Sequence, residues 1–159
     1  MAVAEIDISS PEGLVNALFN HGLTPALAHG ITEDELEAVY AQGYQDLEQG
    51  LLDEALGHLS FLVTQAPWDR RFQYSLGLCQ QHRGEYDSAG SFYANALMLD
   101  ATDALSAFRM GECLAAQDDR DAARDAFEAA IQLSAIGVDQ QQVRGFAESA
   151  LDQLAVSGA

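Results

Sequence analysis

The feature that most constrains this chain is a repeat of 34 residues that runs without gaps. Glycine recurs at Gly43, Gly77 and Gly111. With these glycines as repeat position 8, position 20 is always alanine and position 24 is always large: Ala55, Ala89 and Ala123, then Leu59, Tyr93 and Phe127. This is the tetratricopeptide period. Its small residues let two antiparallel helices approach closely, and its large residue fills the gap between hairpins.

The repeat predicts an all-α fold. We expect three tetratricopeptide helix-turn-helix repeats within 32–137, at about 36–69, 70–103 and 104–137, that form a cupped right-handed superhelix. Thr32 and Glu35 match a capping box before the first helix, and Asp53 is expected to open the second. The paired helices are predicted at about 33–49 and 53–66, 70–83 and 87–99, and 104–117 and 121–134.

Helical segments flank the repeats on both sides. Residues 1–31 form an N-terminal segment in which Ser10 and Pro11 start a helix, and 138–159 form a capping helix and tail. The N-terminal helix has an apolar face outside the repeat pattern, formed by Leu14, Val15, Leu18 and Phe19. Packing on the first hairpin and pairing with a second copy are both open at this point, and we expect a homodimer.

Composition narrows the function. The 159 residues carry a formal net charge of −18 and include no lysine. Such a body repels phosphate backbones and anionic lipid, so we expect neither a nucleic acid nor a membrane as partner. The first seven residues have no basic region and no apolar core, and no apolar run approaches the ~18 residues of a membrane span. We therefore expect a cytoplasmic protein.

The sequence offers no chemistry for catalysis. The four histidines are His21, His29, His58 and His82, and none lies at a spacing suited to zinc. Cys79 and Cys113 occupy equivalent repeat positions, and we interpret them as small buried hydrophobic residues. We expect no catalytic residue, no metal site and no cofactor.

The concave side of the repeats is the informative surface. Repeat positions 2, 5, 9 and 12 of each first helix share one face because they are three to four residues apart. These positions are Glu37, Tyr40, Tyr44 and Leu47, then Arg71, Tyr74, Leu78 and Gln81, then Leu105, Phe108, Glu112 and Ala115. The apolar stripe among them is typical of an interaction site for an extended peptide. The alternative is that its members are core residues, and it stays open above all for Leu78 and Phe108.

The second repeat carries the most specific motif. The stretch Trp68-Asp69-Arg70-Arg71-Phe72 resembles the aromatic-Asp-x-Arg-Phe opening of the second repeat in the class II type III secretion chaperones, which are translocator chaperones of the LcrH/SycD kind. Residues 39–45, 50–55, 76–81 and 107–114 resemble the same family. The resemblance covers about residues 10–155.

The resemblance implies a chaperone of the bacterial cytoplasm that holds the hydrophobic translocators of a type III secretion system before export. It implies a client segment of the Pro-x-Leu-x-x-Pro type in the concave groove, and a homodimer formed through the N-terminal helix. The contacts it implies are Tyr40, Tyr44, Leu47, Leu62, Tyr74 and Leu78, with a departure from relatives at Leu47. Arg71, Gln81 and Phe108 complete the predicted peptide-binding set.

Two other functions remain as alternatives. A generic tetratricopeptide scaffold, for example in pilus biogenesis, would have a polar groove that selects charged termini, and the tyrosine stripe argues against it. An enzyme subunit with a repeat domain would need a catalytic domain in addition to the repeats.

Overall fold

The computed structural model describes residues 10–20, 24–137 and 140–156, and throughout these residues the regular structure is helical. A short N-terminal part comprises α1 (Pro11–Asn20) and α2 (Pro25–Ala28). Three hairpins follow, and α9 (Gln141–Val156) completes the array. The hairpins are α3 (Glu33–Gln49) with α4 (Leu52–Gln65), α5 (Arg70–His82) with α6 (Tyr86–Leu99), and α7 (Ala104–Ala116) with α8 (Arg120–Ser134). The predicted all-α fold of tetratricopeptide type is confirmed.

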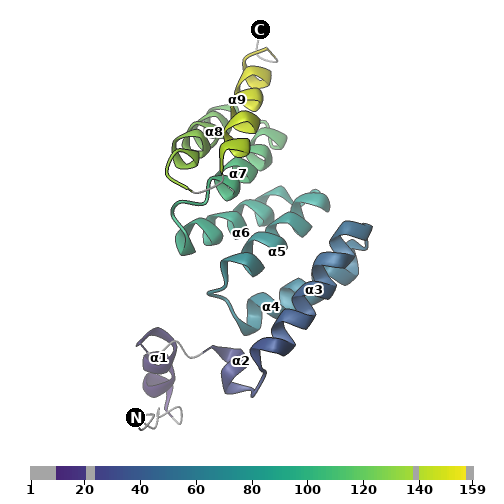
Figure 1. The fold of residues 1–159 in the computed structure, drawn as a ribbon, viewed down its shortest axis with the longest axis vertical. Helices are drawn as coiled ribbons and strands as arrows, with labels where there is room; N and C mark the ends of the chain where they lie inside the picture. Colours follow the sequence, from purple (N-terminus) through teal and green to yellow (C-terminus); the bar gives the residue numbers. More distant parts are fainter. Residues whose placement is uncertain (1–9, 21–23, 138–139, 157–159) are drawn as a thin grey trace.

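The hairpins stack in chain order, so each second helix packs on the first helix of the next hairpin (Figure 1). The same rule brings α8 against α9. The first helices also contact one another along the stack, α3 with α5 and α7 with α9. One face of the array is therefore built from first helices alone.

The glycines at repeat position 8 explain the tight hairpins. A Cβ atom added to Gly111 would lie 2.5 Å from the ring of Phe127, and one added to Gly77 would lie 2.9 Å from the ring of Tyr93. Such distances leave no room for a side chain. The large residue at position 24 therefore packs directly against the backbone of the first helix.

The helix ends follow the sequence closely, with one exception. Thr32 and Glu35 form the predicted capping box, and Ser10 accepts a hydrogen bond from the backbone N–H of Gly13 at 3.0 Å. Asp53 does not cap α4: the cap position is Leu51, and the Asp53 carboxylate instead pairs with Arg83 of the next hairpin. The turns end in left-handed backbone at Gly50, Gly84 and Asp118, which share one repeat position.

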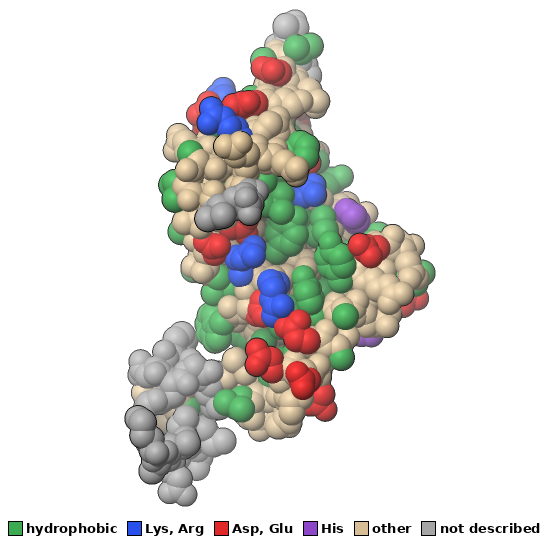
Figure 2. Space-filling view, viewed as in Figure 1, with side chains coloured by type: hydrophobic (Ala, Val, Ile, Leu, Met, Phe, Trp, Pro, Cys, Tyr) green, Lys and Arg blue, Asp and Glu red, His purple; other side chains and the backbone are tan. Residues whose placement is uncertain are grey.

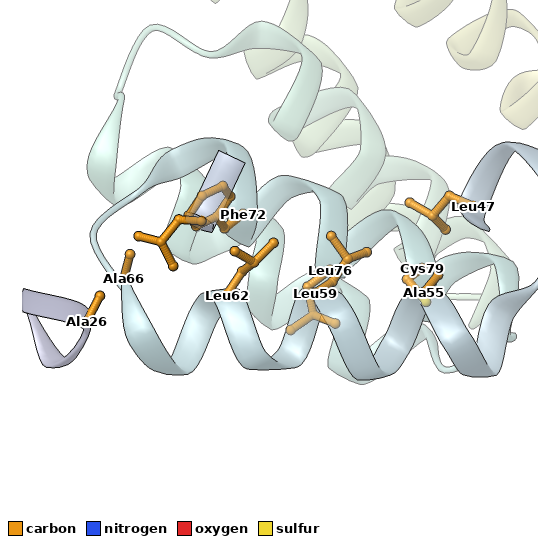
Figure 3. Close-up of a cluster of buried hydrophobic side chains, with 10 residues drawn as sticks. Ala26, Leu47, Ala55, Leu59, Leu62, Ala66, Phe72, Leu76 and Cys79 are labelled. Carbon is orange, nitrogen blue, oxygen red and sulfur yellow. The ribbon is translucent and has the colours of Figure 1, made fainter. Parts of the chain in front are cut away.

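Three core clusters lie within and between the hairpins, and the smallest joins Ala89 and Tyr93 of α6 to Cys113 of α7. The first joins α3, α4 and α5 and includes Leu59, Leu62 and Phe72 (Figure 3). The second joins α7, α8 and α9 and includes Phe127 and Ala147. Cys79 and Cys113 are free, buried thiols, as predicted. Burial raises the pKa of both thiols, that of Cys113 to about 11.

Candidate peptide-binding groove

The first helices present a row of aromatic and apolar side chains on their shared face. Tyr40, Tyr74 and Leu78 are partly exposed there, and Tyr44 is 42% exposed. Figure 2 shows hydrophobic side chains gathered in the hollow between the first hairpin and the C-terminal helices. We call this surface the groove.

Tyr40 is held rigidly at the first-repeat end of the groove. Its ring centroid lies 5.2 Å from that of Phe72 and 6.2 Å from that of Tyr44. Its hydroxyl lies 3.3 Å from the hydroxyl of Ser75, on the next first helix. Neighbouring repeats thus fix an aromatic wall whose outer member, Tyr44, remains accessible.

Arg71 adds a positive charge beside this wall. Its guanidinium lies 5.4 Å from the ring centroid of Tyr40 and 5.3 Å from that of Phe72, a cation–π arrangement. It also pairs with Glu37 at 2.6 Å and with Asp69 at 2.7 Å, and hydrogen bonds to these carboxylates, Asp69 first, raise its pKa further. Arg71 is therefore a fixed cation with an exposed side chain, and a donor that these two carboxylates leave over can bind a peptide carbonyl.

A hollow of about 520 Å³ lies on the other side of Arg71 and Phe72. Its apolar lining comes from α2, the start of α3 and the loop before α5, and includes Leu27, Ile31 and Trp68. Trp68 belongs to the motif at 68–72, which therefore opens onto both the groove and this hollow.

A polar network crosses the groove between the second and third repeats. Arg109 donates to the Tyr74 hydroxyl at 3.5 Å and pairs with Glu112 at 2.8 Å. Glu112 also accepts from the Gln81 amide at 2.9 Å, and the oxygen of Gln81 accepts from the Tyr93 hydroxyl at 2.7 Å. Burial raises the pKa of both tyrosines, so each keeps its proton at neutral pH. Gln81 thus lies on the concave side but uses its amide within the protein.

Three residues of the predicted set are buried rather than displayed. Leu62 is 0% exposed, because its face of α4 packs between α3 and α5, and Leu47 is 6% exposed in the same cluster (Figure 3). Phe108 is 8% exposed because Phe127 and Phe146 cover its ring at centroid distances of 5.6 and 6.0 Å. In this structure these three residues lie largely beneath the groove surface, and their contact with a peptide stays a prediction.

Sequence reasoning missed one residue, Phe146 of α9. It is 56% exposed and packs on Phe108 at the C-terminal end of the groove. The 34-residue period could have found it, because the period continues past Gly111 to Gly145 and places Phe146 at the repeat position of Tyr44, Leu78 and Glu112. The capping helix is thus in register as a further first helix.

Of the predicted dimerisation residues, the structure describes the side chain of Val15 alone, which is 53% exposed. The side chains of Leu14, Leu18 and Phe19 lie outside the described residues, although all four positions belong to α1.

Two features of the described residues bear on other functions. No helix within them is long and apolar enough to cross a membrane. Nor does this part of the chain hold a group of three or more histidine, cysteine or acidic side chains placed to bind a metal ion.

Known proteins are similar to this chain in sequence and in fold. The low calcium response locus protein H of Yersinia pestis is 30% identical over 93 residues, 58% of this chain and 55% of the relative. The crystal structure of the translocator chaperone SycD of Yersinia enterocolitica superposes with a TM-score of 0.78 at 26% identity, covering 83% of this chain and 98% of SycD. This chain is a homologue of the type III secretion translocator chaperones. The resemblance to this family that the sequence predicted is confirmed.

A further structure places a ligand on such a homologue. PcrH of Pseudomonas aeruginosa, in complex with the chaperone-binding region of PopD, superposes with a TM-score of 0.77 at 27% identity, covering 82% of this chain and 98% of PcrH. The alignment with the Yersinia pestis protein spans little more than half of that relative's length. No family model matches this translocator-chaperone homologue.

Proposed function

We propose that the protein is a chaperone for the hydrophobic translocators of a type III secretion system. The observation that carries this proposal is a row of tyrosines on two successive first helices, with Tyr44 exposed and Tyr40 and Tyr74 partly exposed. Homologues with the same fold bind translocator segments, PopD and PopB among them.

The groove suits an extended segment of the Pro-x-Leu-x-x-Pro type. Tyr44 and Leu78 offer apolar contact area, and a tyrosine loses few rotamers on binding. An extended segment has no neighbouring strand to donate hydrogen bonds to its carbonyl groups. Arg71 can donate to them instead. Covering the segment in this way keeps it from self-association, and no step of this binding requires a nucleotide or catalysis.

We place this chaperone in the bacterial cytoplasm, where translocators are made before export.

We also propose a homodimer through 1–31, with Leu14, Val15, Leu18 and Phe19 as the shared face. One crystal structure of the homologue SycD shows an alternative dimer. Light scattering of the full chain and of a variant without residues 1–20 tests this part. A dimer that persists in the truncated variant would contradict it.

Isothermal titration with a synthetic Pro-x-Leu-x-x-Pro peptide tests the function itself. We expect one peptide per chain with a Kd in the micromolar range, about −8 kcal/mol. The matched control is the same peptide with aspartate in place of leucine, which adds a charge that the apolar stripe cannot solvate. Equal binding of both peptides, or binding of neither, would overturn the proposal.

A further inference from the structure

A second hollow lies at the C-terminal end of the groove. It encloses about 600 Å³ between α7, α8 and α9. Its apolar lining includes Phe108, Phe146, Ala150 and Leu154, and Glu112 and Asp118 lie on its polar side. This space can take a large apolar side chain together with the start of a neighbouring one.

The position of Phe146 indicates what the hollow is for. Covering the last hairpin is the work of Val143 and Ala147, which are buried against α7 and α8. Phe146 lies on another side of α9 and remains largely exposed, at the repeat position where the first helices carry Tyr44 and Leu78. Its place in the repeat is therefore that of a ligand-facing residue.

The hollow is continuous with the groove. Arg109 joins them, since it donates to the Tyr74 hydroxyl at 3.5 Å while its guanidinium lies 5.9 Å from the ring centroid of Phe108. Phe108 in turn packs on Phe146. Glu112 lies in the groove network and also lines the hollow. A chain lying on the tyrosines can therefore reach Phe146 without leaving the protein surface.

The charge at the opening of this hollow favours a basic residue next to the bound apolar side chain. Arg120, a cation in the lining, donates to the backbone carbonyl of Leu154, and Glu112 is paired with Arg109. Asp118 is exposed and forms no ion pair with any residue that the structure describes. The adjoining hollow beside it is lined by Asp119 and Asp121 together with Arg120 and Arg124, and Asp121 pairs with Arg124 at 3.0 Å. With a formal net charge of −18, the chain attracts a cation to this edge.

We propose that the groove extends one helix beyond the three repeats, and that the hollow beside Phe146 binds a large apolar side chain flanked by lysine or arginine in the same client. This inference rests on the proposed function, because the other end of the client lies on Tyr40, Tyr44 and Tyr74. It assigns α9 a direct role in binding in addition to its role as a cap.

A displayed peptide library tests the proposal without assuming a direction or a spacing. Each member carries a fixed Pro-x-Leu-x-x-Pro core with eight randomised residues on either side, and selection is run against the full chain. We expect one flank to become enriched in an aromatic or large aliphatic residue beside lysine or arginine. Selection against Phe146→Ala should keep the core and lose that enrichment.

Titration of the most enriched peptide then measures how much Phe146 and Asp118 each contribute to its affinity. We expect Phe146→Ala to weaken binding roughly tenfold, and Asp118→Asn two- to fivefold with a smaller salt dependence. Asparagine tolerates the left-handed backbone of Asp118, whose φ is 63°. The matched controls on α9 are Val156→Ala and Asp152→Asn, both exposed and outside the linings of these hollows. A melting curve for each variant checks the fold.

The outcomes separate this inference from the proposed function. Selection of the core with random flanks, or equal binding by Phe146→Ala and Val156→Ala, would overturn the inference and leave the function standing. The full chain could also retain no library member better than the Tyr44→Ala variant does. That result would overturn the proposed function and the inference with it.

Discussion

The two ends of the groove treat the same repeat position differently. In the first two repeats position 5 is a tyrosine, and its hydroxyl contacts the next first helix, Tyr40 at Ser75 and Tyr74 at Arg109. In the third repeat position 5 is Phe108, which has no hydroxyl and is covered by Phe146. A tyrosine with a polar partner can stay at the surface, whereas a phenylalanine gains more by burial. At the first-repeat end the tyrosine rings of position 5 therefore stay at the surface. At the C-terminal end Phe108 is buried, and Phe146 of α9 is the ring at the surface.

Replacing Phe108 should give the largest effect on stability. Phe108→Ala removes a buried ring from the cluster of α7, α8 and α9, and we expect a loss of about 3 kcal/mol or more in the free energy of unfolding. Urea denaturation followed by circular dichroism measures it. Tyr44→Ala is the matched control and should change stability by less than about 1 kcal/mol. Equal losses of unfolding free energy in the two variants would contradict the view that Phe108 is a core residue and Tyr44 a surface residue.

The tyrosine end should dominate affinity instead. Truncation of an aromatic anchor in an interface costs about 2 kcal/mol, so we expect Tyr44→Ala to weaken the Pro-x-Leu-x-x-Pro peptide roughly thirty-fold. Tyr74→Ala should weaken binding as well. The titration is run beside a melting curve. Unchanged affinity in both variants would mean that the groove is not the site, and a large loss of stability in both would mean that these tyrosines are core.

Two glycines at the same repeat position, Gly111 and Gly145, test whether α9 continues the repeat as a first helix. Gly111→Ala places a methyl group 2.5 Å from the ring of Phe127. Overpacking costs about 1–3 kcal/mol and the better helix former returns up to about 1 kcal/mol, so we expect a net loss of about 1–2 kcal/mol. A Cβ at Gly145 meets no atom of the described residues within 4 Å. Gly145→Ala should therefore raise stability by about 0.5–1 kcal/mol, and a loss there would contradict this account.

The junction between the two ends should give a small effect that depends on pH. Cys113 packs with Tyr93 and Tyr74, and burial raises its pKa to about 11. In the unfolded chain a thiol ionises near pH 8.5, so the unfolded state releases this proton first and stability falls as pH rises from about 8.5 to 11. At pH 9.5 we expect a loss of about 1 kcal/mol in the free energy of unfolding from Cys113. Between about pH 8.5 and 11, the melting temperature of Cys113→Ala should fall less steeply than that of the unmodified chain. The same slope in both proteins would contradict this prediction.

The sequence alone carried most of the fold, because the 34-residue period depends on local close contacts. Gly43, Gly77 and Gly111 each mark a place where two helices meet, and such contacts repeat along the chain. The cap of α4 escaped prediction because the carboxylate of Asp53 has a competing partner, Arg83, 30 residues away. No local rule signals an ion pair between hairpins.

The site was less predictable than the fold. Helical spacing identifies the concave side, and it placed Tyr40, Tyr44 and Tyr74 there together. It does not say how deeply a residue lies, which depends on the neighbouring helices. Phe108 is buried by Phe146, and Leu62 by α3 and α5. Phe146 itself was within reach of the period, which continues from Gly111 to Gly145.

The central claim is that an extended hydrophobic segment lies along the first helices. Paramagnetic relaxation measured by NMR on the isotope-labelled chain, with a spin label attached to a bound Pro-x-Leu-x-x-Pro peptide, tests it most directly. The account predicts the strongest broadening at amides of α3 and α5, around Tyr44 and Leu78, with little effect at Phe61 of α4 or Met98 of α6. Broadening centred on the second helices would contradict it.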